Sequence, residues 1–187
     1  NISYYERPHI LLNDGNASFT ASYDALPSNI TNRTTVHTTS LFLDADQDGD
    51  QDLFLGSSNI HASPHKILMN DGFGNFTPGT ELPDGIFGKD TTITVDSKSF
   101  DFNKDGNLDI LAISTKYNPS YQGSALQVLE SQGDGTFVDV SDIYFITQPG
   151  TTSWTSYANF VDIDNDGSQD IVLEVKGGES SVLYINN

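Results

Sequence analysis

The sequence predicts an all-β fold made of repeated four-stranded units, and three observations support this prediction. Strand- and turn-favouring residues are abundant, whereas no segment has the apolar spacing of a long helix. A nine-residue acidic segment occurs three times, and a glycine-containing turn signature alternates with it. A short apolar run follows each acidic segment, as expected for a strand that begins where the segment ends.

The two signatures recur in fixed phase. The acidic segments are DADQDGDQD at 44–52, DFNKDGNLD at 101–109 and DIDNDGSQD at 162–170, and their starts are 57 and 61 residues apart. The turn signatures are NDGNASF at 13–19, NDGFGNF at 70–76 and SQGDGTF at 131–137. The central glycine of each turn precedes the next acidic segment by 29 residues in all three cases, which defines a structural repeat.

Each repeat is predicted to contain four strands. In the first complete repeat, SLFLD leads into the acidic segment, DLFLGSS leaves it, HKILMN forms the third strand and the fourth begins at Phe76. The Asn-Asp-Gly and Gly-Asp-Gly turns supply residues that tolerate positive φ, as tight hairpins require. The runs 110–113 and 171–173 are apolar on both faces, which indicates strands packed between sheets. Four short strands per repeat are typical of β-propeller blades.

The repeat divides the chain into four segments. Residues 1–35 are the end of one blade with a linker, 36–92 and 93–153 are complete blades, and 154–187 is an incomplete blade. The extra length of the third segment lies between Asp109 and Gly133, where KYNPSYQGSA at 116–125 is predicted to be a longer surface loop. A closed propeller needs about four to eight blades. We therefore expect a segment of a longer protein, with a processed or truncated start, or open edges that pair with other copies.

Composition excludes several functions. The net charge of −18, with only eight Lys and Arg, argues against nucleic acid as a partner. The absence of cysteine excludes disulfides, thiolate catalysis and Cys-ligated metals. No apolar run approaches the roughly 20 residues of a membrane span. Of the 26 acidic residues, 12 lie in the three acidic segments, where they repel one another unless a cation lies among them.

The acidic segments have the pattern of calcium loops. Positions 1, 3, 5 and 9 carry side-chain oxygens, position 7 offers a backbone carbonyl, and a glycine at position 6 allows the chain to reverse. The predicted ligands are Asp44, Asp46, Asp48, Asp50 and Asp52; Asp101, Asn103, Asp105, Asn107 and Asp109; and Asp162, Asp164, Asp166, Ser168 and Asp170. An EF-hand is excluded because position 12 is Leu55, Ala112 or Leu173 in place of Glu, and magnesium is the weaker candidate.

These loops resemble the D-x-D-x-D-G-x-x-D element of FG-GAP/VCBS repeats, which occur in integrin α-subunit propellers and many secreted bacterial proteins. The resemblance implies calcium held between the first two strands of a blade, in a mainly structural role. Gly56-Ser57-Ser58 stands where the family's Gly-Ala-Pro signature is expected, which places the chain nearer the VCBS branch.

Further features indicate an extracellular surface. Five Asn-x-Ser/Thr sequons are candidate glycosylation sites, at Asn1, Asn16, Asn29, Asn32 and Asn75. Trp154, Tyr157, Tyr117 and Tyr121 are candidates for a sugar-stacking surface, although aromatic residues in propeller strands more often belong to the core. The histidines are interpreted as polar loop residues, since no third metal ligand accompanies them.

The sequence therefore predicts a non-enzymatic, calcium-binding module that is secreted or held at the cell surface, with three Ca²⁺ sites. Its expected role is a scaffold for adhesion or for recognition of a carbohydrate or protein. Two alternatives stay open at this point: a subunit that self-assembles into a filament through its open blade edges, and the propeller portion of a carbohydrate-active enzyme.

Overall fold

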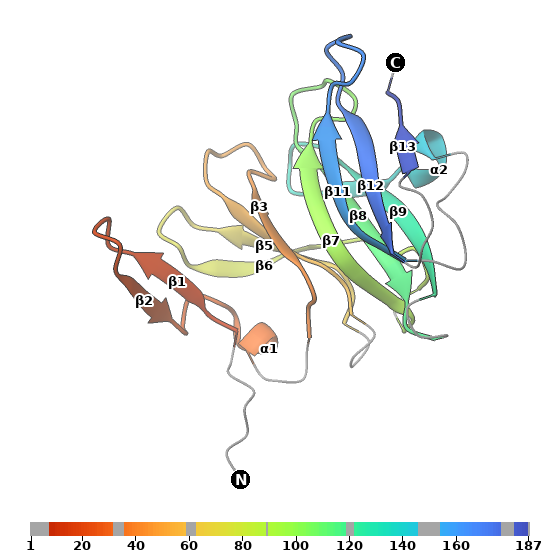
Figure 1. Cartoon of the computed structure of the whole chain (residues 1–187). Helices are drawn as coiled ribbons and strands as arrows, with labels where there is room; N and C mark the ends of the chain where they lie inside the picture. Colours follow the sequence, from red (N-terminus) through yellow and green to blue (C-terminus); the bar gives the residue numbers. More distant parts are fainter. Residues whose placement is uncertain are drawn as a thin grey trace.

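The computed structural model describes residues 8–31, 36–58, 63–88, 90–118, 122–145, 154–176 and 182–186. Its strands form four separate antiparallel sheets, with the N-terminal hairpin at one end of the molecule and the C-terminal sheet at the other (Figure 1). The strands are β1 (Ile10–Asn13), β2 (Phe19–Ser22), β3 (Ser40–Leu43), β4 (Asp52–Leu55), β5 (Lys66–Asn70), β6 (Phe76–Glu81), β7 (Thr92–Phe100), β8 (Asp109–Lys116), β9 (Gln122–Ser131), β10 (Phe137–Asp139), β11 (Trp154–Val161), β12 (Asp170–Lys176) and β13 (Val182–Tyr184).

Each sheet is a meander of sequential strands. The sheets contain β1-β2, β3-β4-β5-β6, β7-β8-β9-β10 and β11-β12-β13, so the predicted all-β fold with propeller-type blades is confirmed. Two one-turn helices, α1 (Ser28–Thr31) and α2 (Ser141–Tyr144), were not predicted. Neither of these described helices has the length and apolar content that a membrane span needs.

The hydrophobic core is divided into three clusters: one packs the segment after β2, including α1, on the second sheet, and the other two lie between consecutive sheets. In β8, Ile110 packs toward the preceding sheet and Leu111 toward the following one, so both faces of the strand are buried. The first cluster joins Ala25, Leu26 and Ile30 to Leu53, Leu55, Leu68 and Phe76. The second joins Leu43, Ala45, Phe54, Ile67 and Leu82 to Ile110, Leu129 and Phe137. The third joins Phe102, Leu111, Ile113, Leu126, Val128 and Phe145 to Ala158, Ile171 and Leu173.

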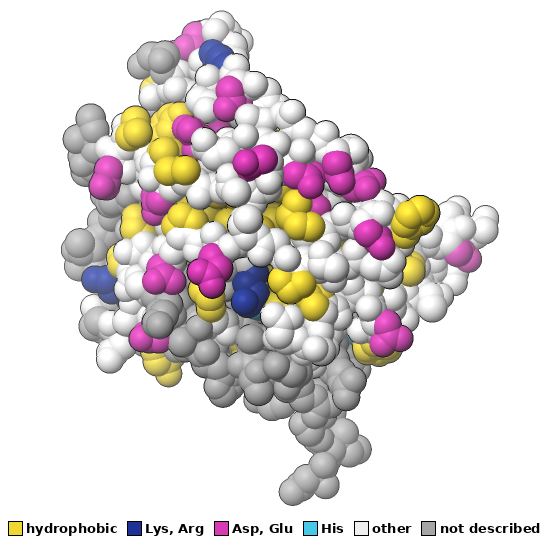
Figure 2. Space-filling model, turned by 180° about the vertical axis from the view of Figure 1, so that it is seen from behind, with side chains coloured by type: hydrophobic (Ala, Val, Ile, Leu, Met, Phe, Trp, Pro, Cys, Tyr) yellow, Lys and Arg dark blue, Asp and Glu magenta, His cyan; other side chains and the backbone are white. Residues whose placement is uncertain are grey.

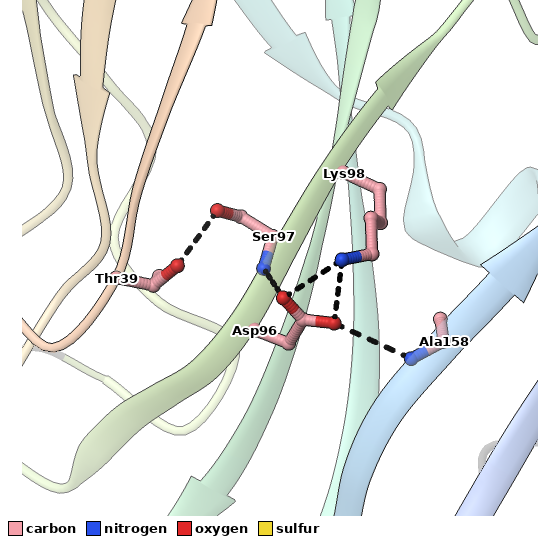
Figure 3. A network of polar contacts seen from close by, with 5 residues as sticks. All are labelled: Thr39, Asp96, Ser97, Lys98 and Ala158. Carbon is pink, nitrogen blue, oxygen red and sulfur yellow. Dashed lines mark hydrogen bonds and ion pairs between the residues drawn. The ribbon is translucent and has the colours of Figure 1, made fainter. Parts of the chain in front are cut away.

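Polar contacts also join the first strands of three consecutive sheets (Figure 3). Asp96 on β7 forms an ion pair with Lys98 at 3.1 Å, and it accepts hydrogen bonds from the backbone amides of Ser97 at 2.9 Å and of Ala158 on β11 at 3.4 Å. The Ser97 hydroxyl lies 3.0 Å from the hydroxyl of Thr39, just before β3. This network therefore fixes β7 relative to both neighbouring sheets.

Of the predicted surface loop at 116–125, most of the described residues lie in strands. β8 continues to Lys116 and β9 begins at Gln122, with these two residues paired, while 119–121 lie outside the described residues. The equivalent strands β4 and β5 contain four and five residues, whereas β8 and β9 contain eight and ten. The prediction was wrong because the polar residues Ser124 and Thr115 pair within the sheet, so the insertion lengthens a hairpin.

Candidate metal centre

Each acidic loop connects the first two strands of a sheet. We refer to 44–52, 101–109 and 162–170 as the first, second and third acidic loops. They join β3 to β4, β7 to β8 and β11 to β12, and position 9 of each loop is the first residue of the second strand. The hairpin geometry brings the two strand ends together, so the residues between them must fold back on themselves.

All three loops share one backbone conformation. The fourth residue has a left-handed φ between 61° and 62°, and the glycine at position 6 has φ between 88° and 95°. The fourth residues are Gln47, Lys104 and Asn165, and the glycines are Gly49, Gly106 and Gly167. Left-handed φ favours glycine and is uncommon for other residues, so its recurrence at the same two positions identifies a specific loop geometry.

Backbone amides hold the carboxylates in place. The position 6 amide donates to the position 1 carboxylate at 2.9–3.1 Å in each loop, as Gly106 does to Asp101. The position 7 amide donates to the position 5 carboxylate at 2.7–2.9 Å, as Asn107 does to Asp105. These bonds turn the side chains inward toward one centre.

The first and third loops bring three carboxylates together. One oxygen of each of Asp44, Asp46 and Asp48 lies within 4.8 Å of the other two. Asp162, Asp164 and Asp166 form an equivalent group in the third loop. The second loop has an amide at the middle position, where Asn103 donates to Asp105 at 2.9 Å. In each of these two groups, the three carboxylates are placed so that a metal ion could bind among them.

One carboxylate oxygen indicates where a cation would bind in the first loop. Oδ1 of Asp44 is buried and has no hydrogen-bond partner in the described part of the chain. In the other two loops the equivalent oxygen, on Asp101 and Asp162, accepts the position 5 amide at 3.0 and 3.1 Å. A buried carboxylate oxygen without a partner is costly unless a cation or donor approaches it. The donor set contains oxygen only, which suits a hard cation such as Ca²⁺.

The aspartates at position 9 lie outside these carboxylate groups. Asp52, Asp109 and Asp170 are buried, and each accepts the position 2 amide of its own loop at 2.8–2.9 Å. The other oxygen of each aspartate accepts a hydrogen bond of 2.8 Å from a backbone amide at the end of the third strand of its sheet or just beyond it. The donors for Asp52, Asp109 and Asp170 are Asn70, Ser131 and Asn186, respectively. Position 9 thus fastens the loop to the third strand of its blade.

Burial raises the pKa of two of the position 9 aspartates. It raises the pKa of Asp109 to about 6, although the amides of Ser131 and Phe102 that donate to this carboxylate act in the opposite direction. Burial also raises the pKa of Asp52. In the second loop, the hydrogen bond from the Asn107 amide lowers the pKa of Asp105. Ionisation of Asp52 and Asp109 in the folded chain therefore costs free energy, which a nearby cation would offset.

The turn signature contacts the acidic loop of its own blade. A Cβ added to Gly72 would lie 2.5 Å from Oδ2 of Asp50, and one added to Gly133 would lie 2.8 Å from Oδ1 of Asn107. Both glycines have positive φ. Position 7 of the loop thus rests against the turn between the third and fourth strands of its own blade.

The described sequons are exposed, and the side chain of Asn75 forms a hydrogen bond. Asn16, Asn29 and Asn75 are exposed, whereas Asn1 and Asn32 lie outside the described residues. Nδ2 of Asn75, the atom that would carry a glycan, donates to Asp71 at 2.8 Å.

Of the four candidate sugar-stacking aromatic residues, two side chains are described and both are exposed. Tyr117 and Tyr157 are 51% and 55% exposed, which is consistent with a surface role. Tyr121 and the Trp154 side chain lie outside the described part.

The histidines are interpreted as polar loop residues, and His65, which lies just before β5, is a buried one. This side chain is buried and lies between the Ser57 amide, which donates to Nδ1 at 3.1 Å, and Gln127, whose Oε1 is 3.1 Å from Nε2. Sequence reasoning missed the fourth loop residues Gln47 and Lys104, which contact the next acidic loop. Their only sequence signal is a long polar side chain at the same loop position.

Together, the sheets and loops define a repeat protein of propeller-type blades. The FG-GAP-like repeat model matches residues 44–112 and 101–173, and each match runs from one acidic loop to the second strand of the next blade. The chain belongs to the FG-GAP-like repeat family. No curated protein gives a significant match to the chain.

Proposed function

We propose that the three acidic loops bind calcium and that the bound ions stabilise a non-catalytic extracellular scaffold for a carbohydrate or protein ligand. The observation that carries the proposal is the convergence of three carboxylates in the first loop and again in the third. Family membership supports it, because repeats of this family often contain calcium sites.

Electrostatics favours a cation in these loops. Two unit charges about 5 Å apart in water repel by roughly 1 kcal/mol, and each three-carboxylate group contains three such pairs. Figure 2 shows carboxylates spread over one face of the molecule with few basic side chains between them. The net charge of −18 adds to this repulsion. Three divalent ions would neutralise six of these charges and favour the folded state.

The ligand sets imply different affinities. Asp44, Asp46 and Asp48 supply three charges in the first loop, whereas Asn103 leaves the second loop with one charge fewer at positions 1, 3 and 5. Calcium affinity follows ligand charge, so the second loop should bind most weakly. Extracellular calcium near millimolar would fill weak sites, which supports a location outside the cell.

A recognition role is supported by the exposed side chains. Tyr117 lies beside the tip of the long β8–β9 hairpin, and Tyr157 lies on the exposed face of β11. Exposed aromatic rings offer apolar faces with a polar tip, which suits stacking on sugars or burial in a protein interface. Glycosylation at the exposed Asn16 and Asn29 is part of the same proposal.

Calcium titration by calorimetry, paired with thermal unfolding, tests the proposal. We expect about three ions per chain and a higher Tm in calcium than in chelator, since each site contributes about 2.7 kcal/mol at 100 times its Kd. Asp46→Asn with Asp48→Asn should remove one ion, and the exposed Asp90→Asn outside the loops should remove none. No heat of binding and an unchanged Tm at millimolar calcium would overturn the proposal.

A further inference from the structure

The fourth residue of each acidic loop contacts the seventh residue of the next. Nε2 of Gln47 donates to Oδ1 of Asn107, although the two residues are 60 positions apart in the chain. Nζ of Lys104 donates to Oγ of Ser168 at 3.0 Å, across 64 positions. The same two loop positions are therefore joined at both junctions between consecutive blades.

The donor end of this contact is fixed by its own loop. Gln47 has φ of 61° and lies between Asp46 and Asp48, two members of the first carboxylate group. A residue held in the left-handed region between two ligand positions changes its conformation when those ligands move. Calcium in the first loop would therefore determine where the Gln47 side chain is presented.

The acceptor end is connected to the next carboxylate group. The Asn107 amide donates to Asp105 at 2.8 Å, and the amide of the buried Ser168 donates to Asp166 at 2.7 Å. The Asn107 side chain also lies against Gly133. A continuous path thus runs from the ligands of one loop, through residue 4 and residue 7, to the position 5 ligand of the next.

We propose that the fourth loop residue couples consecutive calcium sites, so that filling one loop raises the affinity of the next. This inference rests on the proposed calcium function. When the first loop is ordered, Gln47 holds Asn107 and thereby Asp105, so the second loop loses less conformational entropy on binding its ion. Coupling is reciprocal, so calcium in the second loop strengthens binding in the first by the same factor.

The first junction gives the cleaner test. Gln47 is neutral, whereas the Lys104 ammonium adds a positive charge that opposes calcium in the two loops it joins. Removing Lys104 would change both the connection and the charge. Replacing Gln47 by alanine removes the hydrogen bond without changing any charge, and it leaves a non-glycine residue at the left-handed position.

Three glycine amides report on the loops separately. Gly49, Gly106 and Gly167 each donate to the position 1 carboxylate of their own loop at 3.1, 2.9 and 3.0 Å. Their ¹H–¹⁵N signals should shift when that carboxylate binds an ion. A calcium titration followed by NMR therefore gives a Kd for each loop in the complete chain.

The experiment is a double-mutant cycle read at Gly106. Asp46→Asn with Asp48→Asn disables the first loop and should raise the second loop's Kd about fivefold or more. In the Gln47→Ala background the same two substitutions should change that Kd by less than about twofold. Both comparisons remove the same two charges, so through-space repulsion cancels. Gln122→Ala removes an exposed glutamine at the start of β9 that is remote from the acidic loops, and it should leave the Gly106 titration unchanged.

The outcomes distinguish a failure of the coupling from a failure of the proposed calcium binding. If disabling the first loop raises the Kd of the second loop by the same factor with Gln47 and with alanine at position 47, the coupling is overturned. The proposed calcium sites are not affected by that result. If no glycine signal moves at millimolar calcium in the unsubstituted protein, the proposed function fails and the coupling fails with it. Well-dispersed spectra of each variant confirm that it is folded.

Discussion

Gly56 lies where the segment after β4 meets both its own blade and the next. Its amide donates to the Thr39 carbonyl at 2.9 Å. The following Ser57 carbonyl accepts the amide of Thr94 on β7 at 3.0 Å. A Cβ added to Gly56 would lie 2.4 Å from Cγ2 of Thr39 and 3.0 Å from Cβ of Thr94. The missing side chain is what allows these backbones to approach each other.

Replacing Gly56 by alanine should therefore destabilise the fold. We expect a loss of about 1–3 kcal/mol in the free energy of unfolding, because the new methyl group overlaps the Thr39 methyl group. Urea denaturation at fixed calcium measures this loss. Adding Thr39→Ser removes the colliding methyl and keeps the hydroxyl near Ser97, so the double variant should recover much of it. A double variant as unstable as Gly56→Ala would contradict the close approach.

At the scale of strands, a buried polar group connects the start of β5 to β9. His65 accepts the Ser57 amide at Nδ1 and donates from Nε2 to Gln127. Gln127 in turn donates to the Asp84 carbonyl at 2.8 Å and to Asp139 at 2.7 Å. The imidazole is neutral in this arrangement. Burial lowers the pKa of His65 to about 4, with a smaller opposing effect from Gln127.

This network predicts a specific loss of stability in acid. The folded pKa lies below the unfolded value of 6.5, so the contribution of His65 is fully present above pH 6.5 and is lost as pH falls toward about 4. The shift corresponds to a loss of up to about 3 kcal/mol. Urea denaturation between pH 7 and pH 4, in chelator so that calcium release does not contribute, measures this dependence.

His65→Gln is the matched variant for that measurement, since it can donate to Gln127 but does not titrate. Its stability should fall less steeply than that of the unsubstituted protein between pH 6.5 and pH 4, whatever its stability at pH 7. Parallel pH profiles for the two proteins would show that folding does not lower the pKa of His65.

The strands and acidic loops could be predicted because their signals are local. Alternating turn signatures and apolar runs determine each hairpin, and the spacing of Asp44, Asp46 and Asp48 determines how their carboxylates gather. The contact from Gln47 to Asn107 could not be predicted, because it depends on how one blade is rotated against the next. The same reason applies to His65, whose partner Gln127 lies on another sheet. Contacts within a blade follow from the sequence, whereas contacts between blades need the structure.

At the scale of the whole molecule, the hydrophobic clusters of the described residues connect sheets that are neighbours in the chain. Two of them join the second sheet to the third and the third to the fourth, and the other packs the segment after β2, including α1, on the second sheet. β8 lies at the centre of this arrangement and is buried along almost its whole length, whereas β1 and β2 are mostly exposed. Stability should therefore be highest in the third sheet and lowest at the N-terminal hairpin.

Hydrogen exchange should show this gradient. Amides of β8 at 110–113 should exchange about a hundredfold more slowly than those of β1 at 10–13, because local opening of the hairpin exposes little buried surface. Exchange followed by mass spectrometry in excess calcium measures both segments in one sample. Equal protection of the two segments would mean that the molecule opens only as a single unit.

The long β8–β9 hairpin keeps sequence changes at its tip far from the second acidic loop. The second acidic loop lies at the beginning of β8 and the hairpin tip at its other end, so about eight residues of strand, or roughly 26 Å, lie between them. Residues added or exchanged at the tip leave the metal ligands where they are. Related chains could acquire new binding specificities at this end by insertion, and a foreign binding segment could be grafted there, while the calcium-bearing end continues to hold the blades together.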